Sequence, residues 1–367
     1  MVVFLKNSSL TLILGAMAVW VIPYGILQHA GNHPDAGPKE AETKHFRYRA
    51  DFFYGAGSKA WYTNDHESAA DYFKKALQIN RLYVDAWIGL AQTKMETGKT
   101  GPAAEMLRFT HRLTRHAARW KWSQLMLARE LNLEDIFFQN INFLIPLRRF
   151  QNEAFGLLDL HLNGETGAVL QALEDSNVPH YLHWLMKWRR TEACRQVWEV
   201  MTDRNLADDA GYEKYLGFLV SQKDIRRASD LRKQYTGREG MTNPGFESPL
   251  SGTAFGWRSK SRKEWDIRRV SRDAFEGDHA LQVEFSGVEN IHFYHLSQIV
   301  PVEPGKDHTI GFWWKSDHLT TEQRPYVEVI GLDCKNAYWK SEMVPTTTDW
   351  RQEKISISVP ENCHRSE

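Results

Sequence analysis

The chain has 367 residues, of which 25% are charged, and its 46 Lys and Arg balance its 46 Asp and Glu. This length is enough for two domains with buried cores. A net charge of zero gives no reason to expect nucleic acid or an acidic surface as the main partner. The 14 Trp, 13 Tyr and 18 Phe make the chain rich in aromatic side chains, which can either fill cores or form binding faces.

The first predicted element is an apolar segment with no formal charge between Lys6 and His29. A helix over residues 7–28 can cross a hydrocarbon core of about 30 Å. Cleavage as a signal peptide after Ala18 would leave an apolar core of only about six residues, which is too short. We therefore expect a transmembrane signal-anchor at 1–28, followed by a polar, Gly- and Pro-containing stalk at 29–49.

The orientation in the membrane does not follow from the flanking charges, because basic residues lie on both sides of this segment. We infer from the nature of the body that follows that it lies outside the cytoplasm, in the periplasm if the source is bacterial. The expected localisation is thus single-pass and membrane-anchored.

Residues 50–115 repeat with a spacing of 34 residues, so that Phe53 aligns with Trp87 and Ala69 with Ala103. The segment AADYFKKALQIN at 69–80, followed by DAWIGLA at 85–91, resembles tetratricopeptide repeats. In that family small residues stand where paired helices approach each other, and large residues fill the adjoining holes. The packing residues that the resemblance implies are Ala69, Phe73, Ala76, Trp87 and Ala103.

Beyond residue 115 the strict period fades, but the helical pattern continues. We expect one α-solenoid of some five helix pairs over 50–236, with a long helix at His180–Met201 and a helix–turn–helix at 211–234. Such repeats usually hold a protein partner on their surface. A rigid spacer is the alternative, and the sequence does not decide between them.

After residue 240 the pattern changes to short alternating segments bounded by turns, which predicts an antiparallel β-sandwich over 241–367. The side chains predicted to face inward are Leu281, Val283, Phe285, Ile310, Phe312, Trp314, Ile355, Ile357 and Val359. The predicted strands are Trp265–Val270, Ala280–Phe285, His292–Val302, His308–Lys315, Pro325–Leu332 and Glu353–Val359.

Several motifs of this region resemble jelly-roll carbohydrate-binding modules, which have a galactose-binding-like fold. They are NPGFE at 243–247, GDHALQV at 277–283, LSQIVPVEPG at 296–305 and HTIGFWWKS at 308–316. The fold class is thus multidomain α plus β, and the resemblance implies a glycan as ligand. Sugar binding requires flat aromatic faces with polar side chains beside them. The candidate glycan-binding residues are Trp313, Tyr326, Glu328, Trp339, Tyr294 and Arg268.

The resemblance also implies a structural calcium ion, with Glu247 as a candidate ligand. The chain stops after the predicted strand that ends at Val359, where the family has a further strand, so truncation of the sandwich stays open. In an oxidising compartment Cys334 and Cys363 can pair, whereas Cys194 lies in a helical stretch and is expected to be buried.

The sequence contains no nucleophile elbow, Walker loop, dinucleotide fingerprint or zinc-protease motif. We therefore expect a binding or scaffold protein without catalytic activity. Its expected partners are a protein on the repeats, a glycan on the sandwich, and the membrane, with no nucleic acid and a role beside polysaccharide synthesis or export. The alternatives are a structural adaptor whose sandwich binds protein and a carbohydrate-active enzyme.

Overall fold

The computed structural model describes residues 49–287, 291–332 and 338–361. The predicted membrane segment 7–28, nearly all of the stalk, and both Cys334 and Cys363 lie outside these ranges. Within them, no helix combines the length and the apolar character needed to cross a bilayer. The chain divides into two compact units, Met1–Leu206 and Ala207–Glu367.

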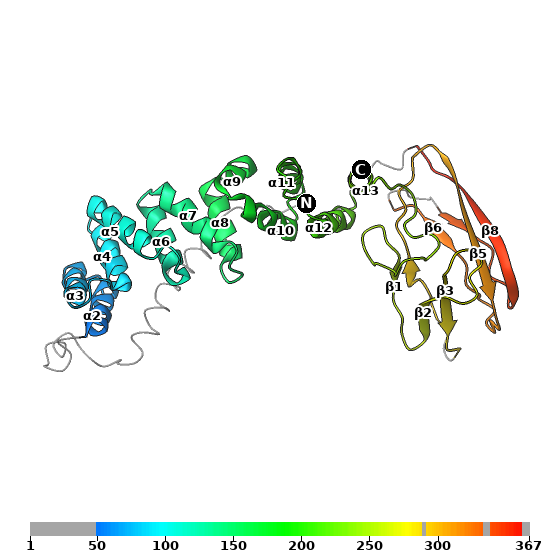
Figure 1. Cartoon of the computed structure of the whole chain (residues 1–367), viewed down its shortest axis with the longest axis horizontal. Helices are drawn as coiled ribbons and strands as arrows, with labels where there is room; N and C mark the ends of the chain where they lie inside the picture. Colours follow the sequence, from blue (N-terminus) through cyan, green and yellow to red (C-terminus); the bar gives the residue numbers. More distant parts are fainter. Residues whose placement is uncertain (1–48, 288–290, 333–337, 362–367) are drawn as a thin grey trace, which may run out of the picture. The chain divides into compact units, whose positions relative to one another are not determined.

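Helices make up the described part of the first unit and the beginning of the second (Figure 1). Twelve α-helices follow one another in the described residues, and successive helices pack in six pairs, where the sequence predicted about five. The helices are α2 (Ala50–Tyr62), α3 (His66–Ile79), α4 (Val84–Glu96), α5 (Thr100–Leu113), α6 (Ala118–Glu130), α7 (Glu134–Leu144), α8 (Gln151–His161), α9 (Thr166–Ala172), α10 (Val178–Lys187), α11 (Thr191–Asp203), α12 (Asp209–Ser221) and α13 (Ile225–Thr236), with a short 3-10 helix at Asp175–Asn177.

The turns inside the first three pairs each contain a residue in the left-handed region. These residues are Asn64, Gly98 and Asn132, with φ of 60°, 74° and 52°. Asn and Gly are the residues that adopt this conformation most readily. Their spacing of 34 residues shows that the period continues into the third pair, where the apolar pattern had faded.

The expectation of a single helix over His180–Met201 is wrong, because α10 and α11 are separated by a turn at Trp188–Arg190. Arg189 has a φ of 53°. Nη1 of Arg190 donates to Oδ1 of Asp159 at 2.7 Å, and Nη2 of Arg190 donates to the carbonyl of Gly164 at 3.2 Å. These bonds hold the turn against the preceding pair of helices.

The core of the first repeats is built on the ring of Phe73, which α3 places between α2 and α4. The predicted small residues Ala69, Ala76 and Ala103 are fully buried. A Cβ atom at Gly57 of α2 or at Gly89 of α4 would lie 2.8 Å or 2.6 Å from the Phe73 ring. Both helices therefore contact this ring with their backbones, which requires glycine at these two positions.

The third repeat departs from this pattern at Lys121, which occupies the position of Phe53 and Trp87 in the 34-residue period. Its residue surface is only 2% exposed, and its Nζ lies 5.2 Å from the centroid of the Phe143 ring. Burial lowers the pKa of this ammonium group. A lysine thus fills a place in the core that an aromatic side chain fills in the earlier repeats.

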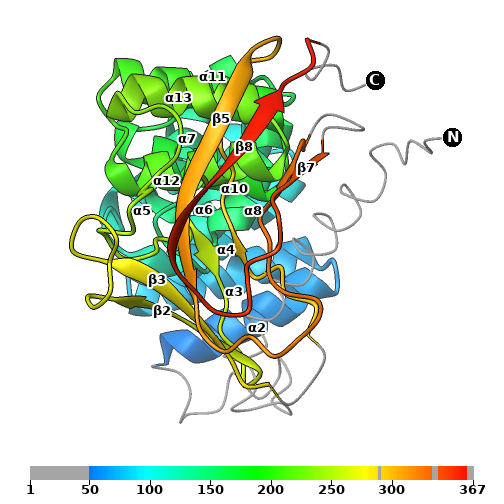
Figure 2. The ribbon, with the colours of Figure 1, turned by 90° about the vertical axis from the view of Figure 1, so that its right-hand side faces the viewer.

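The strands of the second unit form four antiparallel pairs in the described residues: β1 with β4, β2 with β3, β5 with β8, and β6 with β7. The longest pair, β5 with β8, runs along one side of this unit (Figure 2). A closed jelly-roll sandwich stays a prediction. The strands are β1 (Arg258–Ser259), β2 (Trp265–Val270), β3 (Ala280–Phe285), β4 (Leu296–Ser297), β5 (Asp307–Ser316), β6 (Glu328–Ile330), β7 (Tyr338–Lys340) and β8 (Thr348–Ser358).

The alternating pattern predicted β2 and β3 with their bounds and located most of β5 and β8. Burial alternates along β5 as expected, and Ile355 and Ile357 of β8 are buried. The predicted long strand at His292–Val302 is wrong, since only Leu296 and Ser297 pair there. The sequence also missed β1 and β7, which are too short to show an alternating pattern.

We expect Gly57→Ala to lower the free energy of unfolding by about 1–3 kcal/mol, because its methyl group must displace the Phe73 ring. The matched control is Gly55→Ala in the same helix, where an added Cβ meets no atom within 4 Å. This control should raise stability by about 0.5–1 kcal/mol through helix propensity. Equal effects of the two substitutions in chemical denaturation would contradict the close approach at Gly57.

Candidate functional site

An exposed aromatic platform lies on the outer face of β5 and β8, formed by Phe275, Trp313 and Trp350. The Trp313 ring stacks on the Phe275 ring with centroids 3.7 Å apart, and the Trp350 ring lies 6.1 Å from Phe275. Trp313 and Phe275 remain 40% and 45% exposed, unlike the inward-facing residues beside them on β5. The platform thus offers exposed ring surface at the predicted position of Trp313.

Polar side chains surround this aromatic platform. Gln352 lies directly opposite Trp313 in the β5–β8 register, and Nζ of Lys315 lies 3.9 Å from Oδ1 of Asp273. Phe275 comes from the loop between β2 and β3, and the sequence analysis did not single it out. Rings flanked by amide, ammonium and carboxylate groups are the chemistry that a sugar ring requires.

A second polar and aromatic face lies on β6 and β7. Glu328 accepts a hydrogen bond at 2.8 Å from the hydroxyl of Tyr338, and Nζ of Lys340 lies 3.9 Å from the centroid of Tyr326. The Glu328 carboxylate raises the pKa of both tyrosines. Tyr326 and Glu328 are therefore brought together as the sequence predicted, with Tyr338 and Lys340 added to them.

The remaining predicted residues do not join these faces. Trp339 pairs with Val329 in the ladder, so its half-buried side chain points to the opposite side of β7 from Tyr338. Arg268 donates to Glu284 at 2.7 Å and to Gln282 at 3.3 Å on β3. Tyr294 stacks on His295 in a third location. In the described residues no ring contact or hydrogen bond joins these groups, so the six do not form one site.

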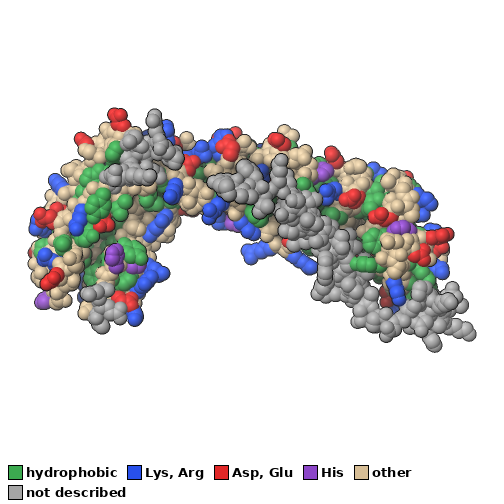
Figure 3. Space-filling model, turned by 180° about the vertical axis from the view of Figure 1, so that it is seen from behind, with side chains coloured by type: hydrophobic (Ala, Val, Ile, Leu, Met, Phe, Trp, Pro, Cys, Tyr) green, Lys and Arg blue, Asp and Glu red, His purple; other side chains and the backbone are tan. Residues whose placement is uncertain are grey.

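Hydrophobic side chains on the surface of the strand-bearing unit lie among Lys, Arg and His (Figure 3). This mixture is typical of a surface that binds through both stacking and charge. In the helical unit Leu82, Phe109 and Leu113 of the second repeat are exposed, and we call these residues, with the half-buried Trp87, the apolar patch. Trp87 packs edge-on against Phe109 at 5.2 Å and donates from Nε1 to the carbonyl of Arg81 at 2.8 Å.

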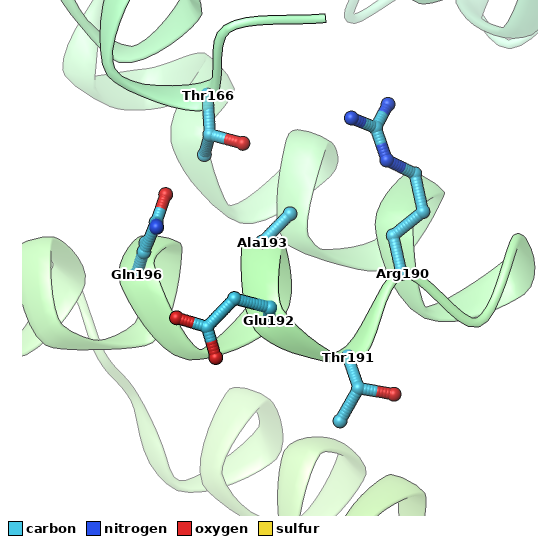
Figure 4. A pocket seen from close by; sticks show the side chains of 6 residues that line it. All are labelled: Thr166, Arg190, Thr191, Glu192, Ala193 and Gln196. Atoms are coloured by element: carbon cyan, nitrogen blue, oxygen red, sulfur yellow. The ribbon is translucent and has the colours of Figure 1, made fainter.

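A shallow depression of about 390 Å³ lies between α9 and α11 (Figure 4). Its lining includes Thr166, Arg190, Glu192 and Gln196. The Arg190 guanidinium is held by Asp159, and Glu192 pairs with Arg195. The side chains point in different directions, with Thr191 turned away (Figure 4). This arrangement does not build a converging site.

Glu247, the candidate calcium ligand, binds the turn at 277–279. Its carboxylate accepts hydrogen bonds from the backbone N–H of Asp278 at 3.2 Å and lies 3.0 Å from Nδ1 of His279. The His279 contact and the N–H donors lower the pKa of the Glu247 carboxyl. The Asp278 N–H and the His279 imidazole are hydrogen-bond donors, whereas calcium requires oxygen ligands. The residues around Glu247 therefore fit a carboxylate that holds the turn at 277–279 better than a calcium site.

No group of three His, Cys, Asp or Glu side chains in the part of the chain that the structure describes is placed to hold a metal ion. Cys194 is buried as expected, and burial raises the pKa of its thiol to about 12. A thiol with this pKa is a poor nucleophile at neutral pH. The buried Cys194 thiol therefore does not provide a catalytic nucleophile.

We expect Glu247→Gln to destabilise the strand-bearing unit at neutral pH, because the carboxylate holds the turn at 277–279. A folded-state pKa below the unfolded value gives stability that is present above about pH 4.3 and lost as pH falls through the folded pKa. The difference from the wild type should therefore vanish in acid-unfolding curves at lower pH. A difference that stays constant across pH would contradict this role. A Ca²⁺-dependent rise in Tm that Glu247→Gln abolishes would instead support calcium.

Comparison with known proteins identifies one part of the chain. The family described as tetratricopeptide repeat matches residues 60–109. No curated protein matches the chain. The 34-residue spacing of the turn residues Asn64, Gly98 and Asn132 agrees with the repeat length of that family.

Two solved structures share a weak likeness. One comes from a functional characterisation of pilF from Pseudomonas aeruginosa, is 16% identical, and covers 52% of this chain and 93% of that chain with a TM-score of 0.29. The other is YrrB, described as a TPR protein with an unusual peptide-binding site, which is 11% identical and covers 53% of this chain and 88% of that chain with a TM-score of 0.28. The family match alone identifies residues 60–109 as tetratricopeptide repeat.

Proposed function

We propose that the chain is a non-catalytic binding scaffold whose helical unit holds a protein partner and whose strand-bearing unit binds a glycan. The observation that carries the glycan part is the exposed stack of Phe275 on Trp313, with centroids 3.7 Å apart. The inward side chains of β5 and β8 already supply the packing of this region, so the platform is not needed as core. Exposed stacked rings on a sheet suit the apolar face of a sugar.

The protein-binding part rests on the tetratricopeptide repeat at 60–109 and on the apolar patch at the second repeat. Leu82 is 65% exposed and lies beside the loop carbonyl that Trp87 binds. Tryptophan, here Trp87, is enriched among the few residues that carry most of the binding energy of an interface. We therefore assign the patch of Leu82, Trp87, Phe109 and Leu113 to the partner.

Anchoring through residues 7–28, a location outside the cytoplasm, and a role beside polysaccharide synthesis or export belong to the same proposal. They rest on the uncharged segment at the N-terminus and on the glycan-binding surface. A structural adaptor whose strand-bearing unit binds protein is the competing function. The adaptor and the glycan-binding scaffold differ in one measurable property, which is whether the Trp313 platform binds a protein or a glycan.

We expect Trp313→Ala to weaken binding of neutral hexose oligosaccharides by about tenfold or more, the equivalent of ~1.4 kcal/mol, because the stacking surface is removed. Trp313→Phe should keep most of the affinity. The matched control is Trp188→Ala, which removes an exposed tryptophan from the helical unit and should change nothing. Titration calorimetry on the full chain measures all three. The absence of any glycan binding, or equal losses at Trp313 and Trp188, would favour the adaptor.

A photo-crosslinking amino acid at position 82 or 109 should give one discrete crosslinked product in cells, because the apolar patch contacts the partner. The control position is Lys74 of α3, which is exposed and pairs with Asp71. It should give no such product. Crosslinks of equal yield at all three positions would argue against a specific partner at this patch.

A further inference from the structure

Basic and aromatic side chains are concentrated at one place in the strand-bearing unit that the proposed function does not use. The segment at 258–263 has the sequence RSKSRK, with four cations in six residues. It runs antiparallel to HFYHLS at 292–297, through the pairs Arg258 with Ser297 and Ser259 with Leu296. The N–H of Lys260 donates to the carbonyl of His295 at 3.2 Å, which extends this pairing.

Four side chains, Arg262 and Trp265 with His295 and Tyr294 of the second segment, form a continuous series of ring contacts. The Arg262 guanidinium lies 5.5 Å from the centroid of Trp265, and the Trp265 and His295 rings are 4.3 Å apart. The Tyr294 ring then stacks on His295 at 4.5 Å with an interplanar angle of 22°. Trp265 and His295 are fixed from below, since Trp265 is buried and donates from Nε1 to the carbonyl of Lys260 at 2.7 Å.

The outer member of the stack faces solvent. Tyr294 is 70% exposed, more than any other large hydrophobic side chain in the described residues. An aromatic ring that is held on one face by His295 and open on the other provides a rigid stacking surface. His292, also exposed, lies edge-on to Tyr294 at 5.6 Å.

Three of the four cations at 258–263 form no ion pair within the residues that the structure describes. Lys263 pairs with Glu264 at 3.3 Å, but no carboxylate of a described residue pairs with Arg258, Lys260 or Arg262. Burial lowers the pKa of the His295 imidazole, and the nearby charges of Arg262 and Lys260 lower it further. The site therefore combines an open ring with cations that form no ion pair with a carboxylate of the described residues.

We propose that this surface, made by Lys260, Arg262, His295 and Tyr294, binds an anionic glycan whose sugar rings carry carboxylates. The apolar face of one ring stacks on Tyr294, while carboxylates of that ring and of the following rings along the chain accept charge-assisted hydrogen bonds from Lys260 and Arg262. This surface is separate from the Trp313 platform. The proposal rests on the proposed function only for the choice of a sugar as ligand.

The observations favour a carboxylated sugar over nucleic acid. Binding to nucleic acid without sequence preference depends on neutralising many phosphates at once. Here three cations, Arg258, Lys260 and Arg262, pair with no carboxylate of the described residues, and their segment runs beside the one that carries a single exposed ring. A polymer with one carboxylate per ring matches one stacking surface with adjacent cations.

The experiment is titration of the full chain with oligogalacturonate, with a neutral galactan oligosaccharide of equal length and with single-stranded oligothymidylate as comparison ligands. Oligogalacturonate should bind more tightly than the other two. The double substitution Lys260→Gln and Arg262→Gln should weaken it about tenfold. Tyr294→Ala should weaken it about fivefold, whereas Tyr294→Phe, which keeps the ring, should not.

The matched control is Lys306→Gln, which removes the same charge from a lysine that pairs with Glu303 and should leave binding unchanged. Circular dichroism of each variant must match the wild type, and Tyr294→Phe reports on folding at that position. In the Trp313→Ala variant, which lacks the platform proposed for neutral sugars, equal affinity for the acidic and neutral sugars would overturn the proposal. An unchanged oligogalacturonate affinity in the double variant would overturn it as well. Tighter binding of oligothymidylate through the same residues would assign the surface to nucleic acid instead. If the Trp313 platform binds no neutral glycan, oligogalacturonate binding should stay intact, so each proposal can be contradicted without the other.

Discussion

The contact of the Phe73 ring with the backbones of α2 and α4 is the constraint on which the helical unit depends. Gly57 and Gly89 bring these helices so close to the ring that an added Cβ would lie under 3.0 Å from its atoms. Ala69 and Ala76 of α3 are fully buried in the same core as Phe73, and Ala103 of α5 is fully buried as well. Small residues thus determine how closely these helices approach each other. Large apolar side chains such as Leu82 and Phe109 lie at the surface.

The sequence predicted the helical unit well because its signals are local and repeated. Small and large residues at a spacing of 34 gave the pairs, and the family match at 60–109 confirms the kind of repeat. The break between α10 and α11 could not be foreseen, since it depends on Arg190 reaching Asp159 and Gly164 in the previous pair. The apolar pattern of the sequence does not show the turn at Trp188–Arg190, because contacts with residues distant in sequence hold it in place. The buried Lys121 was equally hidden, because lysine normally indicates an exposed position.

The strand-bearing unit was predicted less completely. Long strands such as β5 show alternation, but β1, β4, β6 and β7 have only two or three residues each, which is too few to show it. The six candidate residues were grouped by type, and the structure separates them because faces depend on pairing: Trp339 and Tyr338 are neighbours in sequence and point to opposite sides of β7. Phe275 was missed since only the tertiary fold stacks it on Trp313. A net charge of zero likewise hid the local concentration of cations at 258–263.

These features combine into one account, in which a helical unit with an apolar patch for a protein is joined to a unit whose exposed rings serve a sugar. Its central claim is that glycan recognition belongs to the strand-bearing unit alone. Hydrogen–deuterium exchange of the full chain, with and without saturating oligosaccharide, tests this claim most directly. We expect added protection within 258–265, 273–275, 292–297 and the centre of β5, and none over residues 50–206. Protection confined to the helical unit, or none anywhere at saturation, would contradict it.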